Sequence, residues 1–214
     1  MRRLTPSLTI LIVCLTASAV PALDCPHCGG ALSAATAVVR ETPEYDLYGL
    51  EPGLLPGLTT LRYCTSCGWA GNDATAGATP VPSTVADWLA ANEPPDWTTV
   101  CIAVRAAALL EVAGGGDYDL GLAWLRTAWA ARSAEDAALQ EFAYERAYER
   151  LVAYVADHAT GSRLPWARYL AGACAERLGR PGSALAHYRA AQYMGDLPAL
   201  LRSLVNERLY RLEG

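Results

Sequence analysis

The sequence predicts a mainly α protein in which a small zinc-ribbon-like N-terminal module precedes an antiparallel array of TPR-like helical hairpins. Three observations predict this fold class. Two C-x-x-C-G motifs lie in the first third of the chain, glycines and prolines divide residues 84–214 into helix-length segments, and one helical pattern occurs twice. The chain has 214 residues, of which 52% are hydrophobic. That is enough for one domain of ordinary size and a small appendage.

Residues 1–22 have the pattern of a signal peptide. Arg2 and Arg3 form a short basic region, and Val20-Pro21-Ala22 offers small residues for cleavage. The apolar stretch Leu8–Val20 between them is too short to span a bilayer. We expect an exported protein, periplasmic or secreted, with no stable membrane span once the signal is removed. An uncleaved segment that anchors the chain in the membrane is the alternative.

Residues 23–72 are expected to form the zinc-ribbon-like module, because they show no long helical period. The motifs Cys25-Pro26-His27-Cys28-Gly29 and Cys64-Thr65-Ser66-Cys67-Gly68 share one form. The glycine after each second cysteine allows the tight turn of a metal knuckle. Four thiolates are a closed tetrahedral set for a structural Zn2+, and iron fits the same set. The expected metal ligands are Cys25, Cys28, Cys64 and Cys67.

Two other interpretations of these cysteines stay open. Pro26-His27 fills the first motif as in strongly oxidising thioredoxin-like enzymes, so Cys25 and Cys28 could be the working dithiol of a periplasmic thiol–disulfide redox protein. Against this, Gly29-Gly30 is a poor start for the helix that stabilises a redox thiolate. In an oxidising compartment the four cysteines could instead form two disulfides.

Residues 73–83 are a linker by composition, and residues 84–214 are expected to form the TPR-like α-helical domain. Caps and breakers place the helices, with Asp96 expected to cap the second and Ser133 the longest. Short loops make neighbouring helices antiparallel. The expected helices cover residues 84–91, 96–112, 120–131, 133–158, 165–178, 183–194 and 197–212.

The helical pattern that occurs twice begins with a glycine, Gly116 or Gly179, followed by a helix with small residues on one face. Small residues let a partner helix approach closely, so the repetition suggests stacked helical hairpins. In the last hairpin Gly172, Ala184 and Tyr188 occupy positions of the tetratricopeptide (TPR) pattern, although its aromatic positions in the first helix do not match. A generic alanine-rich bundle is the alternative.

Stacked hairpins have a concave face, on which tyrosine and arginine would suit an extended peptide. The residues expected near that groove are Arg126, Arg168, Tyr188 and Arg189. The sequence therefore predicts a non-enzymatic scaffold or adaptor. The metal would stabilise its N-terminal module, and the helical array would bind a protein or peptide partner.

The sequence shows no catalytic constellation: it has no nucleophile elbow, phosphate-binding glycine loop or dinucleotide fingerprint. The net charge is −5, and it becomes −7 if residues 1–22 are removed, because they hold two arginines and no acidic residue. With no basic run as well, nucleic-acid binding is not expected. Cys101 and Cys174 are expected to be buried free thiols, with a mutual disulfide as the alternative.

With a double knuckle followed by helices, the chain resembles an uncharacterised bacterial family, a domain of unknown function that joins an N-terminal cysteine-rich module to TPR-like helices. The similar residues are the two C-x-x-C-G motifs, Trp69 after the second of them, the helix Leu122-Ala123-Trp124-Leu125-Arg126-Thr127-Ala128-Trp129, and the segment 178–191. The resemblance covers residues 24–194. It implies metal binding and protein interaction, without an established activity. The apparent export signal is a departure from the family.

Overall fold

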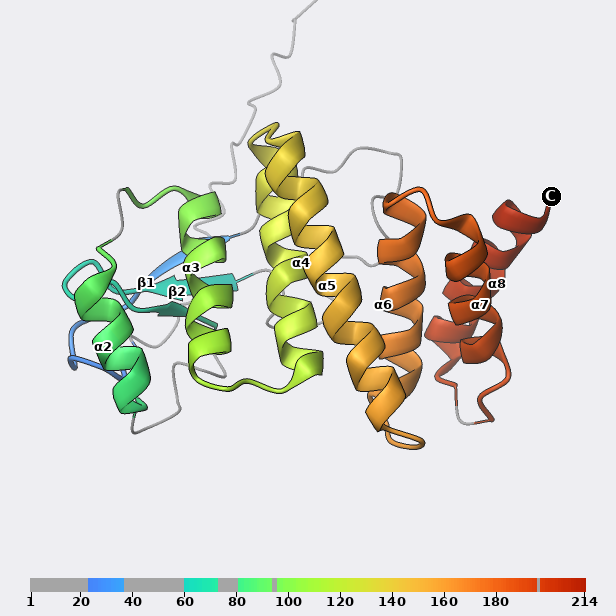
Figure 1. The fold of residues 1–214 in the computed structure, drawn as a ribbon, viewed down its shortest axis with the longest axis horizontal. Helices are drawn as coiled ribbons and strands as arrows, with labels where there is room; N and C mark the ends of the chain where they lie inside the picture. The colour runs from blue at the N-terminus through green and yellow to red at the C-terminus, as the bar shows by residue number, and fades with distance from the viewer. Residues whose placement is uncertain (1–22, 37–59, 73–80, 94–95, 196) are drawn as a thin grey trace, which may run out of the picture.

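The computed structural model describes residues 23–36, 60–72, 81–93, 96–195 and 197–214. The expected signal peptide and most of the expected linker lie outside the described residues. Figure 1 shows the described elements in a row, with a small sheet and helix α2 (Ser83–Ala91) at one end and the C-terminal helices at the other.

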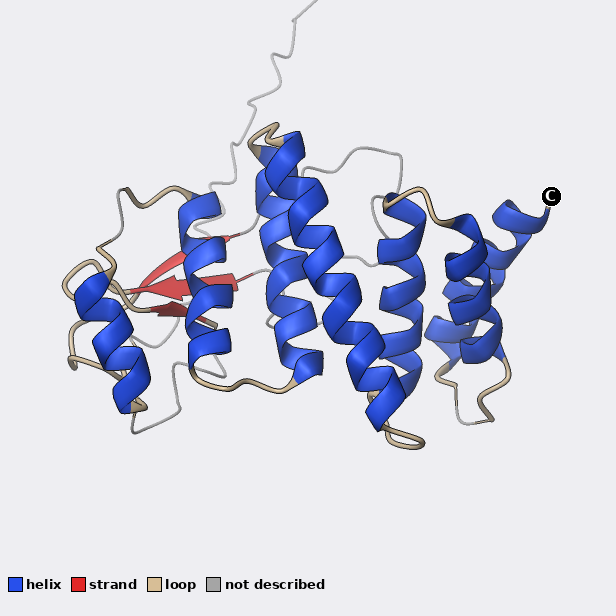
Figure 2. Ribbon diagram, in the orientation of Figure 1, coloured by secondary structure: helices blue, strands red, loops and turns tan. Residues whose placement is uncertain are grey.

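The N-terminal module contains a three-stranded antiparallel sheet in the order β1-β2-β3 (Figure 2). Strand β1 spans Ser33–Thr36, β2 spans Thr60–Tyr63 and β3 spans Ala70–Gly71. The first C-x-x-C-G motif precedes β1, and the second lies between β2 and β3. Because β2 pairs with both other strands, the sheet holds the two motifs close to one another.

The rest of the described chain is helical, which confirms the predicted fold class of a mainly helical protein with a small N-terminal module. Helices that follow one another pack as neighbours, most extensively α4 with α5 and α6 with α7. After α2 the helices are α3 (Thr99–Val112), α4 (Asp117–Ser133), α5 (Ala137–Asp157), α6 (Leu164–Arg177), α7 (Pro181–Gln192) and α8 (Ala199–Glu213).

Two of these helices begin at a different cap from the expected one. The Thr98 side chain caps α3 by accepting a hydrogen bond from the backbone N–H three residues later, whereas Asp96 accepts from the N–H of Thr98 itself. Asp136 caps α5 by accepting from the N–H of Leu139 at 3.0 Å, and Ser133 ends the preceding helix. The expected caps were therefore wrong, because several residues near each start are able to cap and the sequence does not rank them.

Two hydrophobic clusters form the interior of the described part of the chain. The larger lies mainly among α4 to α8. The smaller joins the N-terminal module to the first helices, since it contains Leu61 of β2, Leu89 of α2 and Ile102 of α3, each no more than 4% exposed. The module and these helices thus share one core, although a linker was expected between them.

Small residues bring neighbouring helices close together, as the sequence pattern indicated. A Cβ atom added to Gly172 of α6 would lie 2.7 Å from the ring of Tyr188 on α7. One added to Gly121 of α4 would lie 2.7 Å from the side chain of Leu151 on α5. These separations are shorter than a real Cβ contact, so a side chain at either glycine would push the two helices apart.

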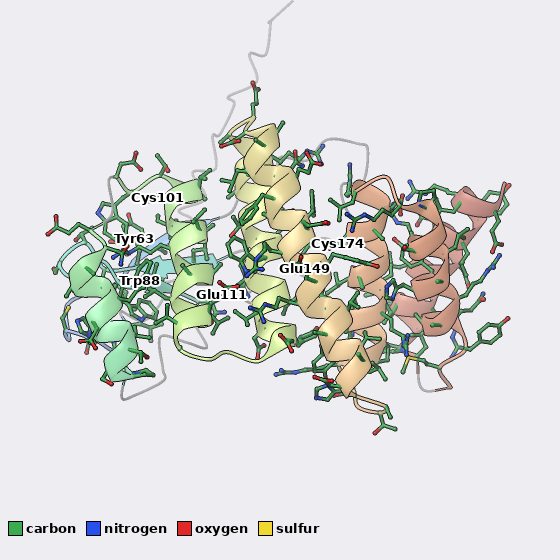
Figure 3. The ribbon with its side chains drawn as sticks, viewed as in Figure 1. Tyr63, Trp88, Cys101, Glu111, Glu149 and Cys174 are labelled. Atoms are coloured by element: carbon green, nitrogen blue, oxygen red, sulfur yellow. The ribbon has the colours of Figure 1, made fainter. Side chains whose placement is uncertain are left out.

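A single carboxylate links three helices. Glu111 lies on the side of α3 that faces α4 (Figure 3). Its Oε1 atom accepts hydrogen bonds from Trp124 at 3.1 Å, from Arg146 at 2.8 Å and from Arg150 at 3.3 Å. Burial alone raises the pKa of Glu111, but the bonds from Trp124 and Arg146 outweigh it and lower that pKa below its usual value. The ionised carboxylate therefore ties α4 and α5 to α3.

Among the helices of the described segments, none combines the length and the apolar character that crossing a bilayer requires.

Candidate metal centre

The two C-x-x-C-G motifs fold into matching knuckles. In the first, the N–H of Cys25 donates to the carbonyl of Gly30 at 2.7 Å, and the N–H of Gly29 donates to the carbonyl of Cys25 at 2.9 Å. The second motif repeats both bonds between equivalent residues, at 2.8 and 3.0 Å. Gly29 and Gly68 have φ angles of +73° and +79°, a left-handed conformation that glycine adopts without strain. The trailing glycines therefore close both turns.

These turns bring four sulfur atoms together. The Sγ atoms of the two cysteine pairs all lie within 4.8 Å of one another. Cys25 lies 3.6 Å from Cys67, and Cys28 lies 3.6 Å from Cys64, both measured between Sγ atoms. Each of these contacts joins one knuckle to the other. The convergence expected from the two motifs is observed.

The separations between the sulfurs suit a tetrahedral metal ion. A zinc ion about 2.3 Å from each of four thiolates separates the sulfurs by about 3.8 Å. The observed 3.6 Å is close to that value. A disulfide bond is far shorter, at about 2.05 Å. The cluster can therefore hold a metal ion whose four positions are all supplied by the protein.

Backbone N–H groups point at the sulfurs and favour their ionised form. Burial raises the pKa of the Cys64 thiol, but hydrogen bonds from the N–H groups of Cys67 and Ser66 outweigh burial and lower that pKa to about 7. Burial keeps the pKa of Cys25 and of Cys67 above its usual value. Several thiolates this close together repel one another, so a cation between them is needed to stabilise all four.

Arg105 of α3 places a positive charge directly beside the cluster. Its Nε atom donates a hydrogen bond to the carbonyl of Gly68, next to the last cysteine. The Cζ atom of its guanidinium lies 4.9 Å from the centroid of the Trp88 ring. Trp88 itself lies on the side of α2 that faces α3 (Figure 3). Arg105 is only 6% exposed. It is placed to offset the negative charge that four thiolates leave on a divalent ion.

Arg105 could not be predicted from the sequence as a site residue, because nothing local marks it. It lies in an alanine-rich helix 37 positions after Gly68 and belongs to no motif. Burial lowers the pKa of the Arg105 guanidinium, and the thiols of Cys101 and Cys67 oppose that effect. Cys101, one turn earlier on the same helix, is half-buried. The one available signal was an arginine at a position that the helical pattern assigns to the buried face.

Two residues expected to line a partner groove are buried instead. Tyr188 is fully buried, and its hydroxyl donates to Glu176 at 3.0 Å. It fills the space beside Gly172, so it is a packing residue between α6 and α7. Arg126 is also buried and faces a cavity beside the N-terminal module. The expectation that both would contact a partner on an open face was therefore wrong.

The other two expected groove residues are more accessible. Arg189 is exposed and pairs with Glu213 of α8, with a shortest N–O distance of 2.8 Å. Arg168 of α6 is half-buried. The structure thus does not bring the four residues of the expected groove together as one exposed surface.

The two cysteines outside the cluster that lie in the described residues, Cys101 and Cys174, are free thiols. Cys174 on α6 is fully buried, and burial raises its pKa. Cys101 on α3 is half-buried. Figure 3 shows them on well-separated helices, so no bond joins them. This agrees with the expected free thiols, although Cys101 is less buried than expected.

Comparison with protein families, with curated proteins and with solved structures finds no match to this chain. The resemblance to a family with a cysteine-rich module and TPR-like helices therefore stays a prediction from the motifs. The structure itself shows a mainly helical protein whose small N-terminal module gathers four cysteines able to hold a metal ion.

Proposed function

We propose that this protein is a non-enzymatic scaffold in which a structural zinc ion fixes the N-terminal module and the helical array binds a protein partner. The observation that carries the proposal is the set of four sulfurs within 4.8 Å of one another. Four thiolates leave no open position for a substrate on a tetrahedral ion, so the metal serves the fold and not a reaction. The proposed ligands are Cys25, Cys28, Cys64 and Cys67.

The described sheet of the N-terminal module is too small to be stable by itself. Its strands are four, four and two residues long. A structural zinc ion contributes on the order of 10 kcal/mol to the folding of such a module. Because the module shares a hydrophobic cluster with α2 and α3, the metal would support the beginning of the helical array as well.

The partner is proposed to bind the helical array. Its last hairpin packs Gly172 and Ala184 as small interior residues, which supports TPR-like stacking. Tyr193, at the end of α7, is 84% exposed, and Tyr210 of α8 is 82% exposed. Tyrosine is enriched where proteins bind one another. We therefore put the partner contact at the C-terminal end of the array, where Arg189 is exposed too.

Zinc as the metal and export as the destination are parts of the proposal that rest on sequence. Zinc is favoured because two knuckles with trailing glycines are typical of structural zinc sites, although iron takes the same four thiolates. Export to the periplasm or beyond rests on the charge and apolar pattern of residues 1–22.

Thiol–disulfide exchange by Cys25 and Cys28 is the competing function. A redox pair lies at the start of a helix, whose dipole stabilises the reactive thiolate. Here residues 29–32 join the motif to strand β1, and none of these described residues is helical. Each of the two sulfurs also has a neighbour at 3.6 Å in the other knuckle, which a working dithiol does not require.

Metal content and thiol reactivity of the purified full chain test the proposal. We expect about one zinc per chain, no visible absorption, and cluster thiols that react with an alkylating agent only after a chelator removes the metal. Cys28→Ser should lose the zinc, and Cys101→Ser, a matched change outside the cluster, should keep it. A metal-free protein with a reversible bond between Cys25 and Cys28 would instead establish the redox function, and visible absorption would establish iron.

A further inference from the structure

A partly open cavity of about 320 Å³ lies beside the N-terminal module. Residues next to β3, at the beginning of α2, along α3 and on α4 form its wall. Most of them are apolar, with Trp69, Val85, Leu109, Leu110 and Ala123 among them. Its volume is at the lower end of the range for small-molecule sites, roughly 300–1,000 Å³.

One charged side chain, Arg126 of α4, lines this cavity. Arg126 is 6% exposed, and its Nε atom is buried without a hydrogen-bond partner. The carboxylate that acts on it electrostatically, Asp119, forms its own ion pair with Arg163 at 3.4 Å. Burial lowers the pKa of Arg126 to about 10, although the negative charge of Asp119 raises it. The guanidinium is therefore still protonated at neutral pH.

A buried guanidinium whose Nε–H has no acceptor is unfavourable, because that group loses its hydration and gains no hydrogen-bonded partner in return. An anion that enters the cavity would supply that partner. The planar guanidinium offers parallel N–H donors that match a carboxylate. Among the described lining residues Arg126 is the one cation, which suits a ligand head with a single negative charge. The apolar remainder of the wall suits a hydrocarbon body.

We propose that this cavity binds an aliphatic carboxylate whose head group pairs with Arg126 and whose chain packs against Leu109 and Leu110. Octanoate combines one carboxylate with a short aliphatic chain, so it serves as the test ligand for this class of compound. The described lining of the cavity includes none of the four clustered cysteines and no residue of α7 or α8.

Calorimetric titration of the full, metal-containing chain with octanoate tests the inference. Octanol and octylamine serve as comparison ligands, because they keep the chain and remove or reverse the charge of the head group. We expect octanoate to bind at least tenfold more tightly than either. Octanol or octylamine binding as tightly as octanoate overturns the proposal, and so does the absence of any octanoate binding.

Variants then test the role of the guanidinium. Arg126→Met removes the charge and keeps much of the volume, so it should weaken octanoate binding at least tenfold and leave octanol binding unchanged. Arg189→Gln, which removes an exposed arginine on α7, should change neither. Ala123→Leu fills part of the cavity and should abolish octanoate binding even if the Arg126 variant does not fold. Unchanged octanoate affinity in a folded Arg126→Met protein contradicts the proposal.

The cavity inference and the scaffold proposal can fail separately, although Trp69 of the cavity wall lies two residues after Cys67 of the second knuckle. A chain that holds zinc but binds octanoate no better than octanol overturns the inference about the cavity and leaves the metal proposal intact. A chain that binds octanoate selectively but holds no metal overturns the metal proposal and leaves the inference about the cavity intact.

Discussion

The guanidinium of Arg105 donates a hydrogen bond to the carbonyl of Gly68, the residue that follows the last cysteine of the metal cluster. This bond joins α3 to the second knuckle. It also places a buried positive charge where four thiolates around a bound divalent ion would leave negative charge. The contact therefore links the stability of the metal site to the packing of the first helices.

Arg105→Met is expected to weaken metal binding by about 10- to 100-fold, because the knuckle loses a donor and the thiolates lose a nearby cation. Competition with a chromophoric chelator measures the change in affinity. Arg163→Met, which removes an exposed arginine that pairs with Asp119 of α4, is the control and should leave metal affinity unchanged. Equal affinities of the Arg105 variant and the unchanged protein would show that the contact has no effect on the metal.

Gly68→Ala and Gly29→Ala form a matched pair. Both glycines have positive φ, so an alanine at either costs about 1–2 kcal/mol of backbone strain. At Gly68 the added Cβ would also lie 2.5 Å from the Nη2 atom of Arg105, whereas at Gly29 it meets nothing within 4 Å. Gly68→Ala should therefore lower the free energy of unfolding more than Gly29→Ala. Denaturant unfolding with saturating zinc gives both values, and an equal loss would contradict the described contact.

Gly172→Ala and Gly182→Ala separate helix packing from helix propensity. At Gly172 the new methyl group would overlap the ring of Tyr188, a clash expected to destabilise the protein by about 1–3 kcal/mol. Gly182 in α7 has free space around it, so alanine there should be neutral or stabilising by up to about 1 kcal/mol. Thermal unfolding of both variants is the measurement. A tolerated Gly172→Ala would mean that α6 and α7 are not packed as closely as described.

Glu111 predicts a specific loss of stability in acid. Its pKa is lowered in the folded state, so its contribution is present above the unfolded value, about 4.5, and is lost as the pH falls through the lower folded value. Glu111→Gln removes this contribution at every pH. The difference in unfolding free energy between the unchanged protein and Glu111→Gln should be largest near pH 7 and shrink below pH 4.5. A difference that does not change over this range would contradict the ion-pair network.

The helices could be predicted from the sequence because glycine and proline mark their ends. Gly114 turns the chain after α3 with a φ of +71°, and Gly179 does so after α6 with a φ of +68°. The four-cysteine cluster could be predicted for a similar reason, since its spacing and trailing glycines describe a local geometry that two motifs share. These features are local in the chain, and local patterns report them well.

The features that could not be predicted depend on contacts between distant segments. Arg105 reaches Gly68 across 37 positions, and the shared core of the module with α2 and α3 depends on how the sheet docks. Tyr188 was expected on an open face because tyrosine is common in binding surfaces. It is buried because Gly172 leaves room for its ring. Arg126 was expected in a groove because arginine also suits a binding surface, and it lines the partly open cavity beside the N-terminal module instead.

X-ray absorption at the zinc edge of the purified protein tests the central claim most directly, because it counts the atoms bound to the metal and measures their distances. We predict four sulfur atoms at about 2.3 Å and no nitrogen or oxygen ligand. A zinc ion bound by fewer than four sulfurs, or a metal-free protein whose four cysteines are oxidised, would contradict the account.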